Sequence, residues 1–170
     1  AYDGTDFCGW AEQKDVRTVQ RTLTDCVRLI SGEDVEIIGA SRTDSGAHAR
    51  GQSCHFIARP EVPPEKWAEI MNRPLPHDVT ILRSREVPPH FHARFSARSR
   101  TYRYRWAHHR DPIRLRTAHW LPRSLDVSQM ASAGQALMGT HDFRGFSEQC
   151  QLVENTVRTI HSLRVESHGD

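Results

Sequence analysis

The sequence has 170 residues, of which 37% are hydrophobic and 26% are charged, and its formal net charge is +2. A chain of this length can bury a core without disulfides or a structural metal, and the composition is ordinary for a soluble globular protein. No apolar run approaches the length of a membrane span and no signal-peptide pattern opens the sequence, so we expect a cytoplasmic protein. The four cysteines form no CxxC pair, which favours buried thiols over a disulfide framework.

The N-terminal part of the sequence predicts a strand end, a glycine-rich loop and a helix. Tyr2 belongs to the strand, and the loop DGTDFCGW follows at residues 3–10. A helix is predicted between a cap at Thr18 and a stop at Gly32. Its apolar residues recur at helical spacing and predict one buried face: Val19, Leu23, Cys26, Val27 and Ile30.

Two strands and a polar loop come next. Residues 35–41 and 53–58 are apolar enough for buried strands, and the loop SRTDSGAHARGQ joins them. A short helix is predicted to begin at Pro63–Pro64, and residues 79–87 predict a further strand. The loop is therefore expected to be mounted rigidly between two strands.

The C-terminal part repeats the order strand, helix, strand. In TYRYRW, residues 101–106, aromatic residues and arginines alternate, so Tyr102 and Tyr104 would share one face of a strand. A helix is predicted from Asp126 to Gly139, and residues 156–167 predict a final strand. We therefore expect an α+β protein with two similar halves, residues 1–97 and 98–170.

The positive charge is concentrated in one stretch. Residues 94–123 contain a single acid, Asp111, and nine arginines, at 94, 98, 100, 103, 105, 110, 114, 116 and 123, so the stretch carries +8 with histidine neutral. This density suits a polyphosphate partner, because each neutralised phosphate releases counterions. The alternative is an arginine-rich surface that only contacts solvent.

Asp44 is the first candidate for chemistry. An aspartate before Ser-Gly is also a common choice for a turn, which is the alternative interpretation. Its sequence neighbours Arg42, His48 and Arg50 favour the ionised carboxylate. An ionised carboxylate on a strand-ending loop can act as a nucleophile or a general base.

Two further patterns leave alternatives open. The aromatic face of TYRYRW predicts either a surface on which bases stack or a packed core face. His90 and His92 would share a face of an extended chain, but no Cys, Asp or Glu nearby completes a set of metal ligands. The sequence contains neither GxxxxGK nor GxGxxG, so a nucleotide cofactor has no support.

Six blocks in one order extend over nearly the whole chain: YDGTDFCGW, TVQ..L, GASRTDSGAHARGQ..HF, N..LP.D, FHARFSA..R.YRY and G.HDF..F. Together they resemble the TruA family of tRNA pseudouridine synthases. The resemblance implies an α+β pseudouridine synthase fold, with two similar halves that each have an antiparallel sheet and packed helices, and an active-site cleft between them. It also implies a homodimer that needs no cofactor or metal and converts uridine to pseudouridine at positions 38 to 40 of the tRNA anticodon stem-loop.

The resemblance also assigns roles to residues. Asp44 matches the catalytic aspartate, Tyr102 the tyrosine that packs against the target base, and Arg42 the arginine that fills the space of the flipped-out base. Further residues of the loop and of the arginine stretch are candidates for contacting RNA: Thr43, His48, Arg50, Gln52, Arg94, Arg98, Arg100, Arg103 and Arg105.

The sequence also departs from the family pattern. Ala11 and Ser41 replace the usual Gln and Gly. Family members continue beyond RVESHGD with two strands and a helix whose arginine pairs with the catalytic carboxylate, so we expect this chain to be part of a longer protein. The alternative function is a tRNA-binding relative that helps tRNA fold without modifying it.

Overall fold

The computed structural model describes residues 1–58, 61–147 and 155–167. It divides into two compact units, Ala1–Arg103 and Tyr104–Asp170, which are described separately below. The division at residues 97 and 98 expected from the sequence stays a prediction. Within the described ranges, none of the helices is both long and apolar enough to span a membrane.

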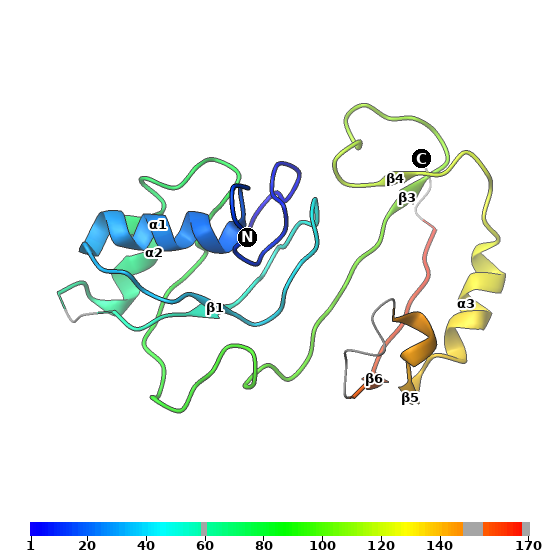
Figure 1. Cartoon of the computed structure of the whole chain (residues 1–170). Coiled ribbons are helices and arrows are strands. Elements are labelled where there is room, and N and C mark those ends of the chain that lie inside the picture. The colour runs from blue at the N-terminus through cyan, green and yellow to red at the C-terminus, as the bar shows by residue number, and fades with distance from the viewer. Residues whose placement is uncertain (59–60, 148–154, 168–170) are drawn as a thin grey trace. The chain divides into compact units, whose positions relative to one another are not determined.

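The longest helix of the first unit, α1, comprises Val19–Ser31 and lies where the apolar spacing predicted it (Figure 1). The Thr18 hydroxyl accepts a hydrogen bond from the Arg21 N–H and caps the N-terminus. Gly32 adopts the left-handed conformation and donates its N–H to the Arg28 carbonyl, which ends the helix. Of the predicted face, Val19, Leu23, Cys26 and Val27 are buried and Ile30 is half-buried.

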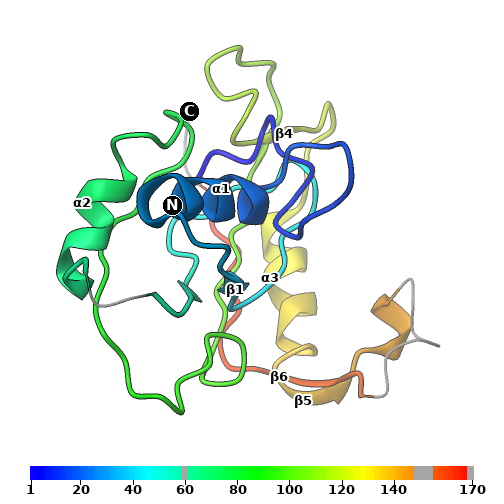
Figure 2. The ribbon, with the colours of Figure 1, turned by 60° about the vertical axis from the view of Figure 1, so that its left-hand side comes forward.

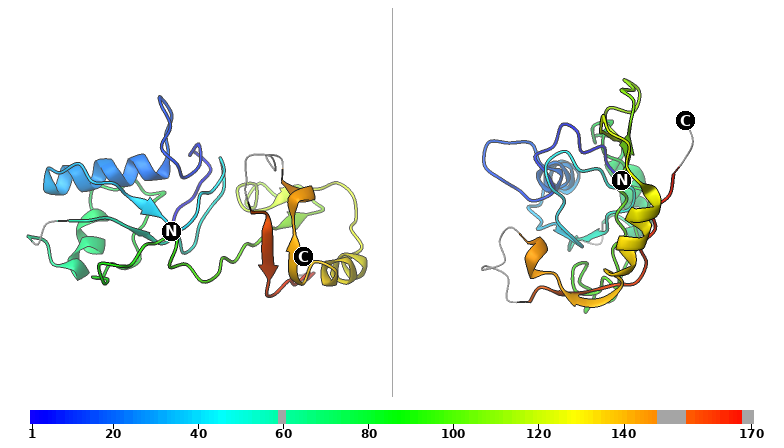
Figure 3. Two further views of the ribbon diagram at one scale, coloured as in Figure 1. Left: turned by 60° about the horizontal axis from the view of Figure 1, so that its bottom comes forward. Right: turned by 90° about the vertical axis from the view of Figure 1, so that its right-hand side faces the viewer.

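Two short strands and a second helix pack with α1. Strand β1 (Ile38–Gly39) pairs antiparallel with β2 (Cys54–His55), and Ile38 lies opposite His55. The 3-10 helix η1 (Pro64–Lys66) leads into α2 (Trp67–Met71), as the Pro-Pro signal predicted. Figures 2 and 3 show α1 next to both β1 and α2. The core contains mainly aromatic and aliphatic side chains from these elements and the first loop: Tyr2, Phe7, Trp10, Val19, Leu23, Val27, Ile37, Trp67, Met71 and Val79.

The strand predicted at residues 79–87 is reduced to a single bridge between Val79 and Tyr2. Beyond Val79, hydrogen bonds between side chains and backbone groups replace those of a ladder. The Asn72 amide binds both the N–H and the carbonyl of Ile81, and Ser84 accepts a hydrogen bond from the Ala68 N–H. These contacts hold the segment against α2, where the sequence pattern had predicted a sheet ladder.

The second unit contains one helix and two pairs of strands. Strand β3 (Trp106–Ala107) pairs parallel with β4 (His119–Trp120). After α3 (Val127–Gln135), β5 (Gly139–Asp142) pairs antiparallel with β6 (Val157–Ile160), and the 3-10 helix η2 (Arg144–Phe146) lies between them in sequence. Both units therefore combine helices with small sheets, which fits the α+β class.

Three elements that the sequence predicted in the second unit are shorter in the structure. Only Trp106 of the predicted strand 101–106 joins a ladder, and β6 is shorter than residues 156–167. Helix α3 starts at its Asp126 cap as predicted but ends at Gln135. The next three residues donate their N–H groups to carbonyls three positions earlier, so the last turn tightens before Gly139 begins β5.

Two of the three described cysteines are at least partly buried, as predicted, and the third is not. Cys26 is buried in α1 and Cys54 is half-buried in β2, whereas Cys8 is exposed, and all three are free thiols. Burial raises the pKa of Cys26 to about 11, so this thiol stays protonated. Cys150 lies outside the described residues.

Candidate active site

The loop that carries Asp44 joins β1 to β2 and packs against the glycine-rich loop at residues 3–10. The Trp10 N–H donates to the Thr43 carbonyl, with an N to O distance of 3.0 Å. The Gly46 N–H and the Ser45 hydroxyl both donate to the Phe7 carbonyl, at 3.1 and 3.3 Å. The backbone is therefore held on both sides of Asp44.

The two loops approach closely at Gly9. This residue has a φ of +84°, a conformation that favours glycine. A Cβ atom placed there would lie 2.6 Å from the Thr43 carbonyl oxygen, closer than any ordinary contact. The second glycine of the DGTDFCGW block, Gly9, is thus required by the position of the loop that carries Asp44.

Hydrogen bonds of the buried Tyr2 and the half-buried Thr43 and Gln52 side chains also hold the loop. The Tyr2 hydroxyl shares a hydrogen bond of 2.9 Å with the Thr43 hydroxyl, and the Tyr2 side chain is buried in the core. Burial raises the pKa of Tyr2, so the phenol remains neutral. The Gln52 amide donates to the Ser41 carbonyl at 2.6 Å. Thr43 and Gln52, which we predicted to contact RNA, therefore hold the loop in this structure.

The Asp44 side chain is exposed. Among the described residues, its carboxylate has no hydrogen-bond or ion-pair partner. Arg42 and Arg50 are also exposed and form no ion pair with Asp44 within the described part. His48 accepts a hydrogen bond from the Gly4 N–H at 3.1 Å and lies 3.0 Å from the Asp3 carboxylate. The carboxylate is thus open to a substrate, while its backbone is fixed.

Within the first unit, Arg100 of the arginine-rich stretch contacts the residue before this loop. The Arg100 guanidinium donates to the Ala40 carbonyl at 2.7 Å, next to the start of the loop. Tyr102 is 78% exposed and forms no ring contact with another described residue. The other predicted RNA-contacting arginines of the stretch lie outside any helix or strand and are exposed: Arg94, Arg98, Arg103 and Arg105.

His92, in the sequence FHAR, packs with aromatic side chains and with His55. The His92 ring stacks on Phe95 with centroids 4.3 Å apart and lies 5.0 Å from the His55 ring. Burial, followed by the nearby His92, lowers the pKa of His55. In the part of the chain that the structure describes, no three His, Cys, Asp or Glu side chains are grouped to hold a metal ion.

Sequence reasoning missed several residues of this site. Phe7, Trp10 and Tyr2 were placed only in a loop or strand, although they anchor the backbone around Asp44. Their presence in one block with two glycines was the available signal, because large aromatic side chains bury much apolar surface and dominate the energetics of a core.

Comparisons with known proteins agree with the motifs. A family model described as tRNA pseudouridine synthase matches residues 1–96 and 133–170. The tRNA pseudouridine synthase A of Brevibacillus brevis is 41% identical over 172 positions, which cover 100% of this chain and 70% of the relative. That of Clostridium acetobutylicum is 39% identical, with 96% of this chain and 68% of the relative covered.

A third relative, tRNA pseudouridine synthase A of Acetivibrio thermocellus, is 40% identical over 97% of this chain and 68% of its own length. The chain thus spans about two thirds of each of these relatives. Identity of this level over nearly the whole chain, together with the family match, confirms the resemblance seen in the six sequence blocks. The chain belongs to the TruA family of tRNA pseudouridine synthases, a family of isomerases.

Proposed function

We propose that this protein converts uridine to pseudouridine in the anticodon stem-loop of tRNA, at positions 38 to 40, and that Asp44 is its catalytic residue. The observation that carries the assignment is the environment of the Asp44 side chain and backbone. Its carboxylate is exposed and has no partner among the described residues, whereas hydrogen bonds hold the backbone on both sides. A turn-forming aspartate would instead use its side chain to bond to the nearby backbone, as Asp3 does with the Thr5 N–H.

The reaction requires the target base to leave the helical stack. Enzymes that act on a paired base flip it into a pocket, and the vacated space must be filled. Arg42 is two residues from Asp44 and exposed, so it can enter the stack while Asp44 reaches the sugar. Tyr102 offers an exposed ring on which the flipped base packs.

Two chemical routes use the same carboxylate. In the first, Asp44 attacks C1′ of the ribose, the bond from C1′ to N1 breaks, and uracil leaves as an anion. The uracil turns, C5 bonds to C1′ as the aspartate leaves, and the C5 proton is lost while N1 is protonated. In the second, Asp44 removes the C2′ proton of the ribose while the bond from C1′ to N1 breaks and uracil leaves as an anion. The proton returns to C2′ when C5 bonds to C1′, and the C5 proton is then lost while N1 is protonated. Both routes conserve every atom of the uridine.

The arginines supply the attraction for tRNA. Exposed arginines at 94, 98, 103 and 105 can pair with phosphates. Within the first unit, the Arg100 hydrogen bond to Ala40 holds Arg100 next to the start of the Asp44 loop. From the family resemblance we further propose two halves around a positively charged cleft, a homodimer, and action in the cytoplasm without a cofactor.

The test measures pseudouridine in an unmodified tRNA transcript by mass spectrometry after incubation with the protein. Asp44→Asn keeps the shape of the side chain and removes its charge. We expect this variant to lose at least about a thousandfold in product formation, as substitution of nucleophiles commonly does, and to bind tRNA with unchanged affinity.

Glu86→Gln is the matched control. Glu86 is an exposed carboxylate of the same unit, remote in sequence from the loop, and its substitution should leave product formation intact. Product formation by Asp44→Asn at the rate of the unchanged protein would refute the catalytic assignment. If neither the protein nor the control forms product while both bind tRNA, a binding function without modification is favoured.

A further inference from the structure

An ion pair outside the Asp44 loop joins two distant parts of the first unit. The Arg17 guanidinium donates two hydrogen bonds to the Asp78 carboxylate, at 2.7 and 2.9 Å. The two residues are 61 positions apart in sequence. The Asp78 side chain is only 10% exposed, and the planar fork of arginine matches the two carboxylate oxygens. This geometry distinguishes the pair from the exposed pairs that Arg21 forms with Glu12 and Asp25.

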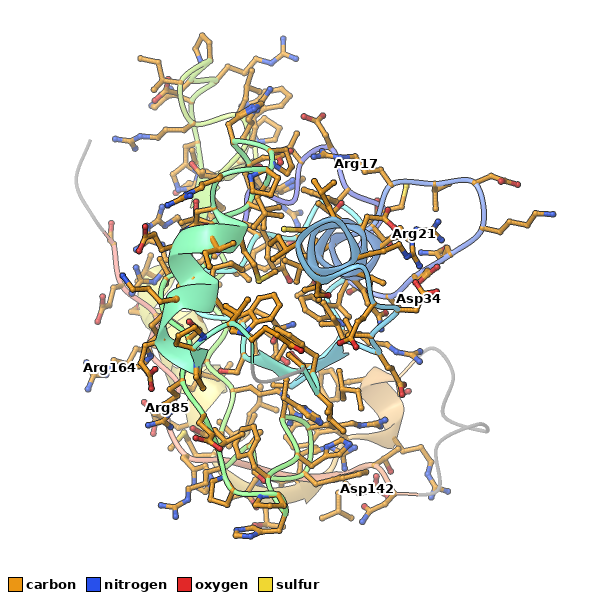
Figure 4. The ribbon with its side chains drawn as sticks, turned by 90° about the vertical axis from the view of Figure 1, so that its left-hand side faces the viewer. Arg17, Arg21, Asp34, Arg85, Asp142 and Arg164 are labelled. Carbon is orange, nitrogen blue, oxygen red and sulfur yellow. The ribbon has the colours of Figure 1, made fainter. Side chains whose placement is uncertain are left out.

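Arg17 also covers an aromatic ring. Its guanidinium carbon lies 3.9 Å from the centroid of the Phe7 ring, and Phe7 is 2% exposed. The Arg17 carbonyl accepts a hydrogen bond from the Cys8 N–H at 2.8 Å. Side chain and backbone of Arg17 therefore hold the same short segment of the glycine-rich loop. Figure 4 shows Arg17 and Arg21 beside α1, which is seen end-on.

Asp78 anchors the other end of the loop. The Asp3 N–H donates to the Asp78 carbonyl at 2.9 Å, and the adjacent Val79 bridges to Tyr2. The loop from residue 3 to residue 10 is thus held at its start by Asp78 and in its middle by Arg17. These two anchors are locked together by the ion pair.

Arg17 covers Phe7, and the backbone of Phe7 holds the Asp44 loop. The carbonyl of Phe7 accepts both hydrogen bonds from Ser45 and Gly46, directly after Asp44. From this chain of contacts we infer that Arg17 and Asp78 are positioning residues for catalysis, which fix the Asp44 backbone through Phe7. The inference rests on the catalytic role of Asp44 proposed above.

The substitution Arg17→Lys tests this arrangement. Lysine keeps the charge and can approach Asp78, but it lacks the fork and the planar face that stacks on Phe7. Hydrogen exchange of single amides, measured by NMR without any turnover, reports whether the loop opens more often. We expect exchange of the Gly46 amide to accelerate about tenfold, while the core amide of Val27 in α1 accelerates far less.

Activity supplies the second measurement. If the Asp44 backbone is less well placed, kcat for pseudouridine formation should fall by about tenfold to a hundredfold, while the Kd for tRNA is retained. Arg21→Lys is the matched control, because Arg21 also pairs with carboxylates, but these belong to Glu12 and Asp25, outside both loops. It should change neither the exchange of Gly46 nor kcat.

The two measurements separate the two proposals. Exchange of Gly46 that is unchanged in Arg17→Lys, or that rises only in parallel with Val27, would overturn the positioning role. Faster exchange with unchanged kcat would also overturn it, because the pair would then hold the loop without serving catalysis. Full activity of Asp44→Asn would instead refute the catalytic assignment, whatever the exchange data show for Arg17.

Discussion

Replacing Gly9 by alanine should both destabilise the protein and displace the Asp44 loop. A residue with a Cβ atom pays about 1–2 kcal/mol in the left-handed region that Gly9 occupies at φ +84°. In addition, the new Cβ would lie 2.6 Å from the Thr43 carbonyl oxygen. The loops must separate to relieve this contact, which weakens the hydrogen bond from Trp10 to Thr43, worth about 1 kcal/mol net. We expect a total loss of about 2–3 kcal/mol.

Gly32→Ala provides the matched comparison. Gly32 has a similar φ of +71°, but a Cβ atom placed there has no atom within 4 Å. Only the conformational cost of about 1–2 kcal/mol therefore applies. Unfolding in urea, followed by circular dichroism, gives both free energies, and the difference of about 1 kcal/mol isolates the contact with Thr43. Equal destabilisation of the two variants would refute the close approach of the two loops at Gly9.

Two further outcomes follow from the charges. The hydrogen bonds from Arg17 lower the pKa of Asp78, so this pair stabilises the fold fully above the ordinary aspartate pKa and less as the pH falls through the lowered value. Asp78→Asn should therefore remove this part of the loss of stability in acid, measured by urea unfolding at several pH values. An unchanged dependence of stability on pH would contradict the prediction. Replacing Arg98 and Arg103 together by glutamine should weaken tRNA binding and reduce the slope of log K against log salt by about 1.4–1.8. Replacing Arg83 and Arg85 together by glutamine is the control, and it should leave the slope unchanged; Arg85 extends away from the ribbon in Figure 4. Equal slopes in both double variants would exclude Arg98 and Arg103 as phosphate contacts.

Local signals in the sequence were sufficient for the helix starts and for the family. Thr18 and Asp126 cap α1 and α3 as predicted, because an N-cap depends on a side chain and the backbone two or three residues later. The stripe of Val19, Leu23 and Cys26 identified the buried face of α1. The six motifs identified the family, since their order and spacing are themselves properties of the sequence.

Strands were predicted less well, because a strand needs a partner that the sequence does not name. The alternation in TYRYRW is typical of a strand, yet Tyr102 and Tyr104 are exposed and only Trp106 pairs. Residues 79–87 have a strand composition, but the Asn72 side chain, next to α2, binds the backbone groups of Ile81, and the Ser84 hydroxyl accepts the Ala68 N–H of α2. In both segments, the available hydrogen-bond partners decided the outcome, against the intrinsic preference of the residues.

The sequence by itself determined where Asp44 lies along the chain and that a polar loop between two strands carries it. Only the tertiary structure decided what holds that loop. Phe7, Arg17 and Asp78 are far apart from Asp44 or from one another in sequence, and their contacts depend on the three-dimensional distances between side chains and carbonyls. Spacing along a chain predicts which residues share a helix or strand face, whereas contacts between separate loops arise only when the core brings those loops together.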